Sequence, residues 1–251
     1  FMKLNTLNKN KILKNIDENR VNIVIYDKIG STNDECKSKK LNKDFNIICA
    51  EEQTKGRGRM GKEWSSPLGN IYMSIAFSGS TIDEPLSLIT GLICREAINK
   101  VIKEDVVGLK WPNDIILNKK KIGGVLVEKE VLGFDVINIV GIGINLKVVK
   151  KESWWGDLSN YNNDIDRNEL INIIVTKFIS YVDAGMSNWK KRWEDSCMHL
   201  NSNIKIQSNN NFINEGKFIG INNTGALKIN SIKDGKIYEY EYGDISIKGV
   251  Y

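Results

Sequence analysis

Apolar residues recur along the chain at two different spacings, which predict helices and strands in turn. Runs rich in β-branched and aromatic residues predict strands at 21–26, 45–50, 71–77, 106–111, 115–117, 122–128 and 134–144. Apolar residues three or four positions apart predict helices at 2–18, 34–41, 83–103 and 170–193. Several strands follow one another without a helix between them, so the pattern favours an α+β fold over a doubly wound sheet.

The last helical pattern contains one weak point, Gly185, because glycine is a poor residue for a helix interior. Beyond Leu200 the pattern changes to short β-prone runs separated by Asn, Gly and Asp. These runs lie at 204–207, 211–219, 226–229, 236–242 and 245–248. Such closely spaced short strands predict a small barrel or sheet. We therefore expect two domains, residues 1–200 and residues 201–251.

Composition excludes several classes of protein. With 41% apolar residues among 251, the chain can build a core, and a net charge of +5 is too small to indicate a nucleic-acid binder. The four cysteines form no C-x-x-C pair, and the single histidine, His199, argues against Ser-His-Asp or Cys-His catalysis. Neither a signal peptide nor an apolar run of about 18 residues is seen, so we expect a cytoplasmic protein.

The strongest local signal for chemistry is the segment GRGRMGKEW at 56–64. Closely spaced glycines allow backbone N–H groups to turn towards an anion, and the planar guanidinium groups of Arg57 and Arg59 suit carboxylate and phosphate oxygens. The spacing is neither that of a Walker A loop nor that of a dinucleotide-binding turn. The segment therefore predicts an anion site, with a solvated basic turn as the alternative.

Two further motifs lie at predicted strand ends. In KWPND at 110–114, the proline stops strand pairing directly after Lys110, which can then point into a crevice. Glycine pairs within strands, at 123–124 and at 141 and 143, indicate a bulge or a close ligand approach. The second pair would leave a flat floor for a ring. An ordinary strand end and simple bulges are the alternatives.

In this order, the motifs resemble those of the biotin–protein ligases. The matching segments are STN at 31–33, 53–64, SP at 66–67, YMS at 72–74, KWPND at 110–114, GGVLVE at 123–128, GIGINL at 141–146 and YGDISIK at 242–248. The resemblance implies a class II synthetase-like catalytic domain, in which helices pack on a mixed β-sheet, followed by a small SH3-like β-barrel. It points to the short form of the family, without an N-terminal DNA-binding domain.

The resemblance also implies an activity, that of a biotin–[acetyl-CoA-carboxylase] ligase. Such an enzyme uses ATP and Mg²⁺ to convert biotin into biotinyl-5′-AMP, and then transfers biotin to a lysine of a biotin carboxyl carrier protein. The metal ligands stay unassigned. A lipoate or octanoate ligase of the same fold, and a non-catalytic module that binds biotin or the carrier, are the alternatives.

Site residues follow from the resemblance by motif position. Biotin-binding positions would be Ser31, Thr32, Asn33, Gln53, Gly56, Arg57, Lys110, Gly123 and Gly124. Nucleotide-binding positions would be Arg57, Arg59, Trp64, Asn113 and Asn145. The catalytic groups would be Lys110 and Arg59. As alternatives, Ser31 and Asn33 are helix caps and Trp64 is a packing residue.

The partners expected from these features are biotin, ATP and the carrier protein. Only about twenty residues precede the first predicted strand, which is room for one helix, so we expect no nucleic-acid partner. We expect no membrane partner either, and both a monomer and a homodimer stay open. Residues 56–64 have few apolar anchors, so we expect them to be mobile until ligand binding orders them.

Overall fold

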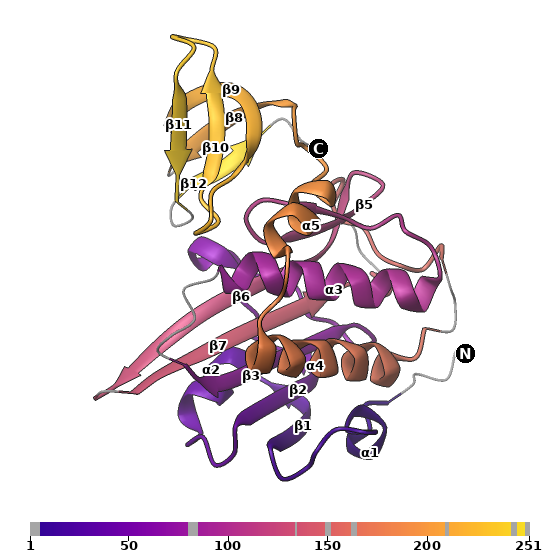
Figure 1. The fold of residues 1–251 in the computed structure, drawn as a ribbon. Coiled ribbons are helices and arrows are strands. Elements are labelled where there is room, and N and C mark those ends of the chain that lie inside the picture. Colours follow the sequence, from indigo (N-terminus) through magenta and orange to yellow (C-terminus); the bar gives the residue numbers. More distant parts are fainter. Residues whose placement is uncertain are drawn as a thin grey trace.

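The computed structural model describes residues 6–79, 85–133, 135–148, 152–161, 165–208, 211–241 and 245–248. The helices are α1 (Lys9–Ile12), α2 (Thr32–Ser38), α3 (Leu86–Ile102), α4 (Arg167–Ala184) and α5 (Trp189–Asp195). The first seven strands are β1 (Val21–Ile29), β2 (Phe45–Gln53), β3 (Ile71–Ser78), β4 (Gly108–Lys110), β5 (Asp114–Leu117), β6 (Lys120–Leu132) and β7 (Asp135–Ile144). The last five are β8 (Asn203–Ser208), β9 (Asn211–Ile221), β10 (Leu227–Ser231), β11 (Ile237–Tyr240) and β12 (Ile245–Lys248). Figure 1 shows their arrangement.

The larger sheet is mixed, as the sequence predicts. Its strand order is β1-β2-β3-β7-β6-β5-β4, and the pair β1–β2 is parallel while the other neighbours are antiparallel. Alternate residues of a strand point to opposite faces. In β2, Ile47 therefore belongs to the main core with α3 and α4, whereas Ile48 packs with Cys36 of α2. Helices thus cover both faces of this sheet (Figure 1).

Two predicted helices are shorter than the spacing of apolar residues suggests. The pattern at 170–193 is wrong as a single helix: α4 stops at Gly185, whose φ is 72°, and α5 starts after Asn188, whose φ is 54°. Both angles are left-handed, which glycine and asparagine tolerate best. At the N-terminus, α1 spans four residues instead of the expected helix at 2–18. Leu4, part of that expected helix, lies outside the described residues, as do the expected helix starters Asp83 and Glu84.

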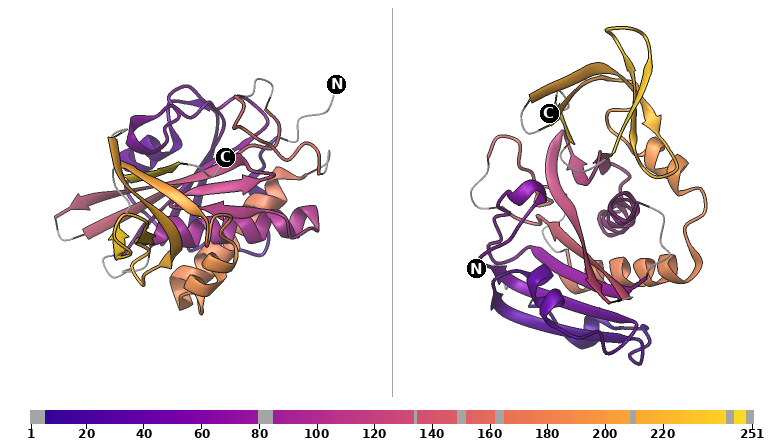
Figure 2. Two further views of the ribbon diagram at one scale, coloured as in Figure 1. Left: turned by 90° about the horizontal axis from the view of Figure 1, so that it is seen from above. Right: turned by 90° about the vertical axis from the view of Figure 1, so that its left-hand side faces the viewer.

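The five predicted C-terminal strands form a separate antiparallel sheet in the order β11-β10-β9-β8-β12. It lies at one end of the molecule, beside α5 (Figure 2). Buried residues of this sheet, such as Ile204 and Phe218, belong to the same apolar cluster as the main core. The indole N–H of Trp111 also donates to the carbonyl of Gly225, at 3.0 Å. The second sheet therefore packs against the larger part of the molecule, near α3 and α5. Among the described helices, none is long and apolar enough to cross a bilayer.

Candidate functional site

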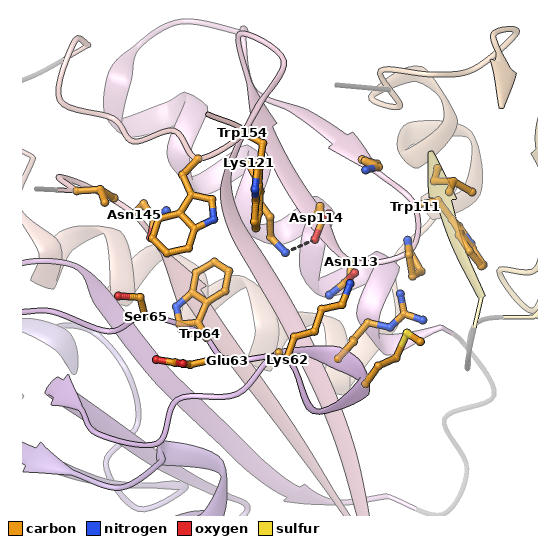
Figure 3. Close-up of a pocket in the computed structure, with 18 of the residues that line it drawn as sticks. Lys62, Glu63, Trp64, Ser65, Trp111, Asn113, Asp114, Lys121, Asn145 and Trp154 are labelled. Atoms are coloured by element: carbon orange, nitrogen blue, oxygen red, sulfur yellow. Dashed lines mark ion pairs between the residues drawn. The ribbon is translucent and has the colours of Figure 1, made fainter. Parts of the chain in front are cut away.

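Two adjoining cavities lie at one edge of the larger sheet. The larger one has a volume of about 860 Å³, and the smaller one about 40 Å³. Four residues line both cavities: Gly58, Trp64, Asn113 and Lys121. Figure 3 shows the larger cavity, with Trp64, Lys121 and Asn113 projecting into it from different segments. A molecule that occupied both cavities would pass this shared boundary.

The small cavity is walled by polar groups that bond to one another. Gln53 Oε1 accepts hydrogen bonds from the backbone N–H of Thr32 at 2.8 Å and from its hydroxyl at 3.1 Å. Ser74 Oγ lies 2.7 Å from Thr32 Oγ1 and 2.6 Å from Asn33 Oδ1. Asn33 Nδ2 donates to Glu128 Oε2 at 2.6 Å. Ser31 holds the N-cap position of α2, but its side chain caps no N–H and lines the cavity instead. The wall is therefore pre-built, and it offers amide and hydroxyl groups in fixed positions.

The floor of the small cavity is the pair Gly141 and Gly143 in β7, on the same face of the strand. A Cβ atom on Gly143 would lie 2.7 Å from the indole of Trp64, so the ring lies directly against this glycine. The flat floor that the sequence predicts is thus covered by the chain's own side chains, the Trp64 ring at Gly143 and the Asn33 amide at Gly141. Only a small space, about 40 Å³, remains beside them. The indole N–H is buried and has no hydrogen-bond partner among the described residues.

The segment at 56–64 is a small closed hairpin rather than an irregular loop. Trp64 N donates to Gly56 O at 2.9 Å, and Gly58 N donates to Lys62 O at 2.6 Å. The tip turns through Met60 and Gly61, which have φ values of 56° and 69°. Gly56 lines neither cavity; a Cβ atom there would lie 2.5 Å from the carbonyl oxygen of Trp64, so it closes the hairpin.

An ion-pair network ties this hairpin to α2 and β6. Arg57 makes two hydrogen bonds to Asp34, at 2.5 and 2.6 Å, and its guanidinium lies 3.6 Å from Glu128. Hydrogen bonding to Arg57 lowers the pKa of Asp34. Burial opposes ionisation of Glu128, but hydrogen bonds from Asn33 and Lys37 outweigh it and lower its pKa. Both carboxyl groups therefore stay charged near neutral pH, and Arg57 is held beside the small cavity.

The large cavity is lined by cations and aromatic rings. Arg59 comes from the hairpin tip and Lys110 from the end of β4, where it is 6% exposed. Lys121 forms an ion pair with Asp114 at 2.5 Å, and its Nζ lies 5.2 Å from the ring centroid of Trp64. Of the described residues that line both cavities, Lys121 is the only cation. Arg59 and Lys110 thus line the large cavity, while Lys121, paired with Asp114, lies where the two cavities meet.

The strand that carries Lys110 is held from outside the sheet. Leu109 N donates to Ser196 O at 2.8 Å, and Met198 N donates to Leu109 O at 2.9 Å. His199 follows this segment and is buried. Burial, together with the charge of Lys110, lowers the pKa of His199 to about 3. The imidazole is therefore neutral near pH 7 and adds no positive charge beside Lys110.

The structure divides the residues suggested by sequence into three groups. Six of the nine biotin candidates line the small cavity: Ser31, Thr32, Asn33, Gln53, Arg57 and Gly124. The nucleotide candidates that line the large cavity are Arg59, Trp64, Asn113 and Asn145, joined there by Lys110. Arg57 lines only the small cavity. Gly123, like Gly56, lines neither, because a Cβ atom on it would point towards Ile115 in the core.

Sequence reasoning misses several residues of the large cavity, among them Lys121, Trp154 and Trp155. The two tryptophans meet edge to face, with ring centroids 5.6 Å apart, and Trp154 is 44% exposed. Figure 3 shows the rings of Trp64 and Trp154 on the same side as Asn145. The two tryptophans are adjacent in an otherwise polar segment, and this pattern could have marked them as candidate site residues. Ile247 lies in the matching segment 242–248, but no site role was expected of it; it reaches the cavity from the second sheet.

Comparisons with known proteins find similar sequences and similar folds. Residues 25–145 match the family described as Biotin/lipoate A/B protein ligase family. The bifunctional ligase/repressor BirA of Escherichia coli is 31% identical over 220 residues, which is 82% of this chain and 67% of BirA. The biotin protein ligase of Aquifex aeolicus in complex with biotin and ATP superposes with a TM-score of 0.73 at 25% identity, covering 90% of this chain and 98% of that one. For the Leishmania major biotin protein ligase with biotinyl-5-AMP, the TM-score is 0.63 at 25% identity, over 88% of this chain and 98% of that one.

Proposed function

The chain belongs to the biotin/lipoate A/B protein ligase family, and we propose that it is an ATP-dependent biotin ligase. In this proposal, the small cavity receives the ring system of biotin and the large cavity receives ATP. The observation that carries it is the shared boundary of the two cavities, formed by Gly58, Trp64, Asn113 and Lys121. The carboxylate of biotin would meet the α-phosphate there, beside the cations of the large cavity.

The first step joins two anions. A carboxylate oxygen of biotin attacks the α-phosphorus of ATP, and the bond from that phosphorus to the oxygen bridging to the β-phosphate breaks. Biotinyl-5′-AMP and pyrophosphate result. Two unit charges about 4 Å apart repel by about 4 kcal/mol at an effective dielectric constant of about 20. Lys110 and Arg59 would offset this repulsion and stabilise the charge that develops on the phosphoryl oxygens.

The second step transfers the activated acyl group. The neutral amine of a lysine on the biotin carboxyl carrier protein attacks the acyl carbonyl carbon, an amide bond forms and AMP leaves. Until then the mixed anhydride has to be shielded from water. Trp64 and Trp154, both in the wall of the large cavity, would provide this shield. We assign no general base to this step.

A magnesium ion fits the residues of the large cavity. Among the described residues, no group of three or more acidic, histidine or cysteine side chains is placed to bind a metal. Glu63 and Asp114 line the cavity, and Mg²⁺ commonly binds one or two carboxylates together with substrate phosphates. When bound, Mg²⁺ neutralises phosphate charge and polarises the phosphoryl group.

Entry of biotin requires Trp64 to move. The indole of Trp64 lies directly against Gly143 and leaves only a small space, about 40 Å³, in this cavity. The substrate ring would replace the indole on this floor, and Trp64 would then flank the adenine. The hydrogen bonds among Thr32, Gln53 and Ser74 do not need to rearrange, because Thr32 and Gln53 already line the cavity and buried Ser74 supports Thr32.

Incubation of the chain with biotin, ATP and Mg²⁺ tests the proposal. Mass spectrometry should detect bound biotinyl-5′-AMP, with release of pyrophosphate. Addition of the biotin carboxyl carrier domain of acetyl-CoA carboxylase should discharge the adenylate and form one biotinyl-lysine. Parallel reactions with lipoate and octanoate test the related activity of the family. If lipoate or octanoate forms an adenylate in preference to biotin, the assignment of biotin as the substrate is wrong. If none of the three acids forms an adenylate, the proposed enzymatic function is wrong.

A further inference from the structure

Asn70 lies just before β3, is fully buried and lines neither cavity. Its Oδ1 accepts hydrogen bonds from the backbone N–H groups of Leu146 and Lys147, at 2.8 and 2.9 Å. Its Nδ2 donates to the carbonyl of Pro67 at 3.3 Å. The side chain therefore bridges two segments that are about eighty positions apart in the sequence.

Both bridged segments belong to the wall of the large cavity. Pro67 lines it directly, and Leu146 immediately follows Asn145, whose side chain also lines it. Asn145 has further fixed contacts: its N–H donates to Ile122 O at 2.7 Å, and its side-chain amide donates to the carbonyl of Gly156 at 3.1 Å. The backbone of Asn145 also accepts from Leu158 N at 3.2 Å, and β3 pairs with β7 at Ile71 and Ile144. Asn70 adds a side-chain link between this segment and Pro67.

Asn70 is itself anchored from the far side of the sheet. Its carbonyl accepts a hydrogen bond from Arg167 Nη1 at 3.1 Å. The same guanidinium is paired with Glu51 at 2.8 Å, and both side chains are nearly inaccessible to solvent. A buried ion pair of this kind loses much when a partner moves, because a charge is then left uncompensated. The position of Asn70 is therefore set by α4 and β2, not by the cavity it supports.

We propose that Asn70 is a positioning residue for the nucleotide: it holds Asn145 and Pro67 in the relative placement that the bound nucleotide requires. This inference rests on the proposed function, in which the large cavity receives ATP. The small cavity has its own wall network, with no hydrogen bond to Asn70. Loss of the Asn70 side chain should therefore weaken nucleotide binding and leave biotin binding nearly unchanged.

The same strand pair contains a matched control. Asn138 in β7 is also buried, at 1% exposure, and its Nδ2 donates to Gly79 O at 2.8 Å. Asn138 pairs with Phe77, near the C-terminal end of β3. Asn70 directly precedes the N-terminal end of β3, where Ile71 pairs with Ile144. Asn138 lines neither cavity. Asn138→Ala therefore removes a buried asparagine from the same two strands without touching the nucleotide side.

Two further variants separate the contacts of Asn70. Asn70→Asp keeps an oxygen that accepts from Leu146 and Lys147, but it replaces the donor to Pro67 with a second oxygen of a buried carboxyl group. Tyr72→Phe leaves Asn70 intact but removes the second donor to Pro67 O, the Tyr72 hydroxyl at 2.8 Å. If the hydrogen bonds to Leu146 and Lys147 matter most, the ATP affinity of Asn70→Asp should stay near that of the wild type. Tyr72→Phe should then change the ATP affinity only slightly.

The experiment measures the KM for ATP, the dissociation constants of ATP and biotin by calorimetry, and the melting temperature of each full-length variant. We expect Asn70→Ala to raise the KM and the dissociation constant for ATP roughly tenfold, since two N–H groups lose their acceptor. The dissociation constant of biotin should change by less than about threefold. Asn70→Asp should recover most of the ATP affinity, and Asn138→Ala should lower only the melting temperature.

Three results would overturn the inference: equal weakening of ATP and biotin in Asn70→Ala, an equal KM shift in Asn138→Ala, or no recovery in Asn70→Asp. If Asn70→Ala does not fold, Asn70→Asp and Tyr72→Phe provide the test. Both variants keep an oxygen at position 70 that accepts from Leu146 and Lys147, so the inference predicts near-normal ATP affinity in both. Failure of the proposed function is a separate result, namely a wild-type chain that binds ATP but forms no adenylate. The calorimetric comparison would then still test the role of Asn70.

Discussion

The two cavities differ in how the chain builds them. The small cavity is walled by neighbouring elements, with its polar groups on α2, β2, β3 and β6 already bonded to one another. The large cavity combines the hairpin at 56–64, the turn after β4, the segment around Trp154 and Ile247 of the second sheet. The first arrangement is suited to recognising one rigid ligand. The second brings charge together from segments that must be held in place by distant contacts, such as those of Asn70.

The largest effect should come from Lys110→Ala, which acts in the large cavity alone. Removing this cation should lower the rate of adenylate formation roughly 10²- to 10³-fold, because a preorganised charge is lost where charge develops. Biotin binding should stay partly intact, since Lys110 does not line the small cavity that receives the rings. Pyrophosphate release and calorimetry measure the two effects. Lys129→Ala, an exposed lysine of β6, serves as the control. A minor change of rate in Lys110→Ala would favour a non-catalytic binding module.

The region behind the large cavity should also respond to pH through His199. The unfolded imidazole gains a proton below its usual pKa of about 6.5, whereas the folded one resists protonation until about pH 3. The unfolded state therefore binds more protons in this range, and stability falls as the pH falls. Between about pH 7 and about pH 5 the loss should be about 2 kcal/mol. His199→Phe should remove this contribution to the pH dependence of stability. Urea unfolding of both proteins at pH 7 and pH 5 measures the free energies to compare. Identical pH dependence in both proteins would contradict the assignment.

In the small cavity, Thr32→Val should weaken biotin binding selectively. The substitution keeps the shape of the side chain but removes the hydroxyl that contacts Gln53 and Ser74. Two buried polar groups then lose a partner, and we expect roughly a tenfold increase in the dissociation constant of biotin. The dissociation constant of ATP should stay within about twofold. Comparable weakening of both ligands would mean that the two cavities are not independent.

The smallest effect is expected at the hairpin. Asp34→Asn removes the ion pair with Arg57, but both side chains are partly exposed, and such pairs contribute roughly 0.2–1 kcal/mol. Trypsin should therefore cleave after Arg57 or Arg59 only up to about fivefold faster in the variant. Biotin or the adenylate should protect the wild-type hairpin from cleavage. Equal cleavage with and without ligand would argue against ordering of this segment.

Features that depend on short sequence segments could be predicted from the sequence, whereas features that depend on how distant segments pack could not. The strands of the larger sheet follow from runs of apolar residues, and the small-cavity residues lie in short motifs such as Ser31–Asn33 and Gln53. The break at Gly185 was visible only as a weak point, because its left-handed φ appears only in the folded chain. The burial of His199 beside Lys110 and the contribution of Ile247 depend on how the second sheet packs. No local pattern encodes such packing.

The same limit applies to the hairpin and to Trp64. Alternating glycine and arginine indicated an anion site, but hairpin closure depends on the pairing of Gly56 with Trp64 and of Gly58 with Lys62. The glycine floor was predicted to receive a ring, and the structure places the ring of Trp64 there. Which side of a strand a glycine faces also decides its role: Gly124 lines the small cavity, while Gly123 faces Ile115.

A crystal structure of the chain with a non-hydrolysable analogue of biotinyl-5′-AMP would test the central claim most directly. The account predicts fused rings on the Gly141–Gly143 floor in place of the Trp64 indole, and adenine beside Asn145. The acyl phosphate analogue should cross the shared boundary within hydrogen-bond reach of Lys110 or Arg59. An analogue bound elsewhere, or bound with both cations turned away from it, would contradict the account.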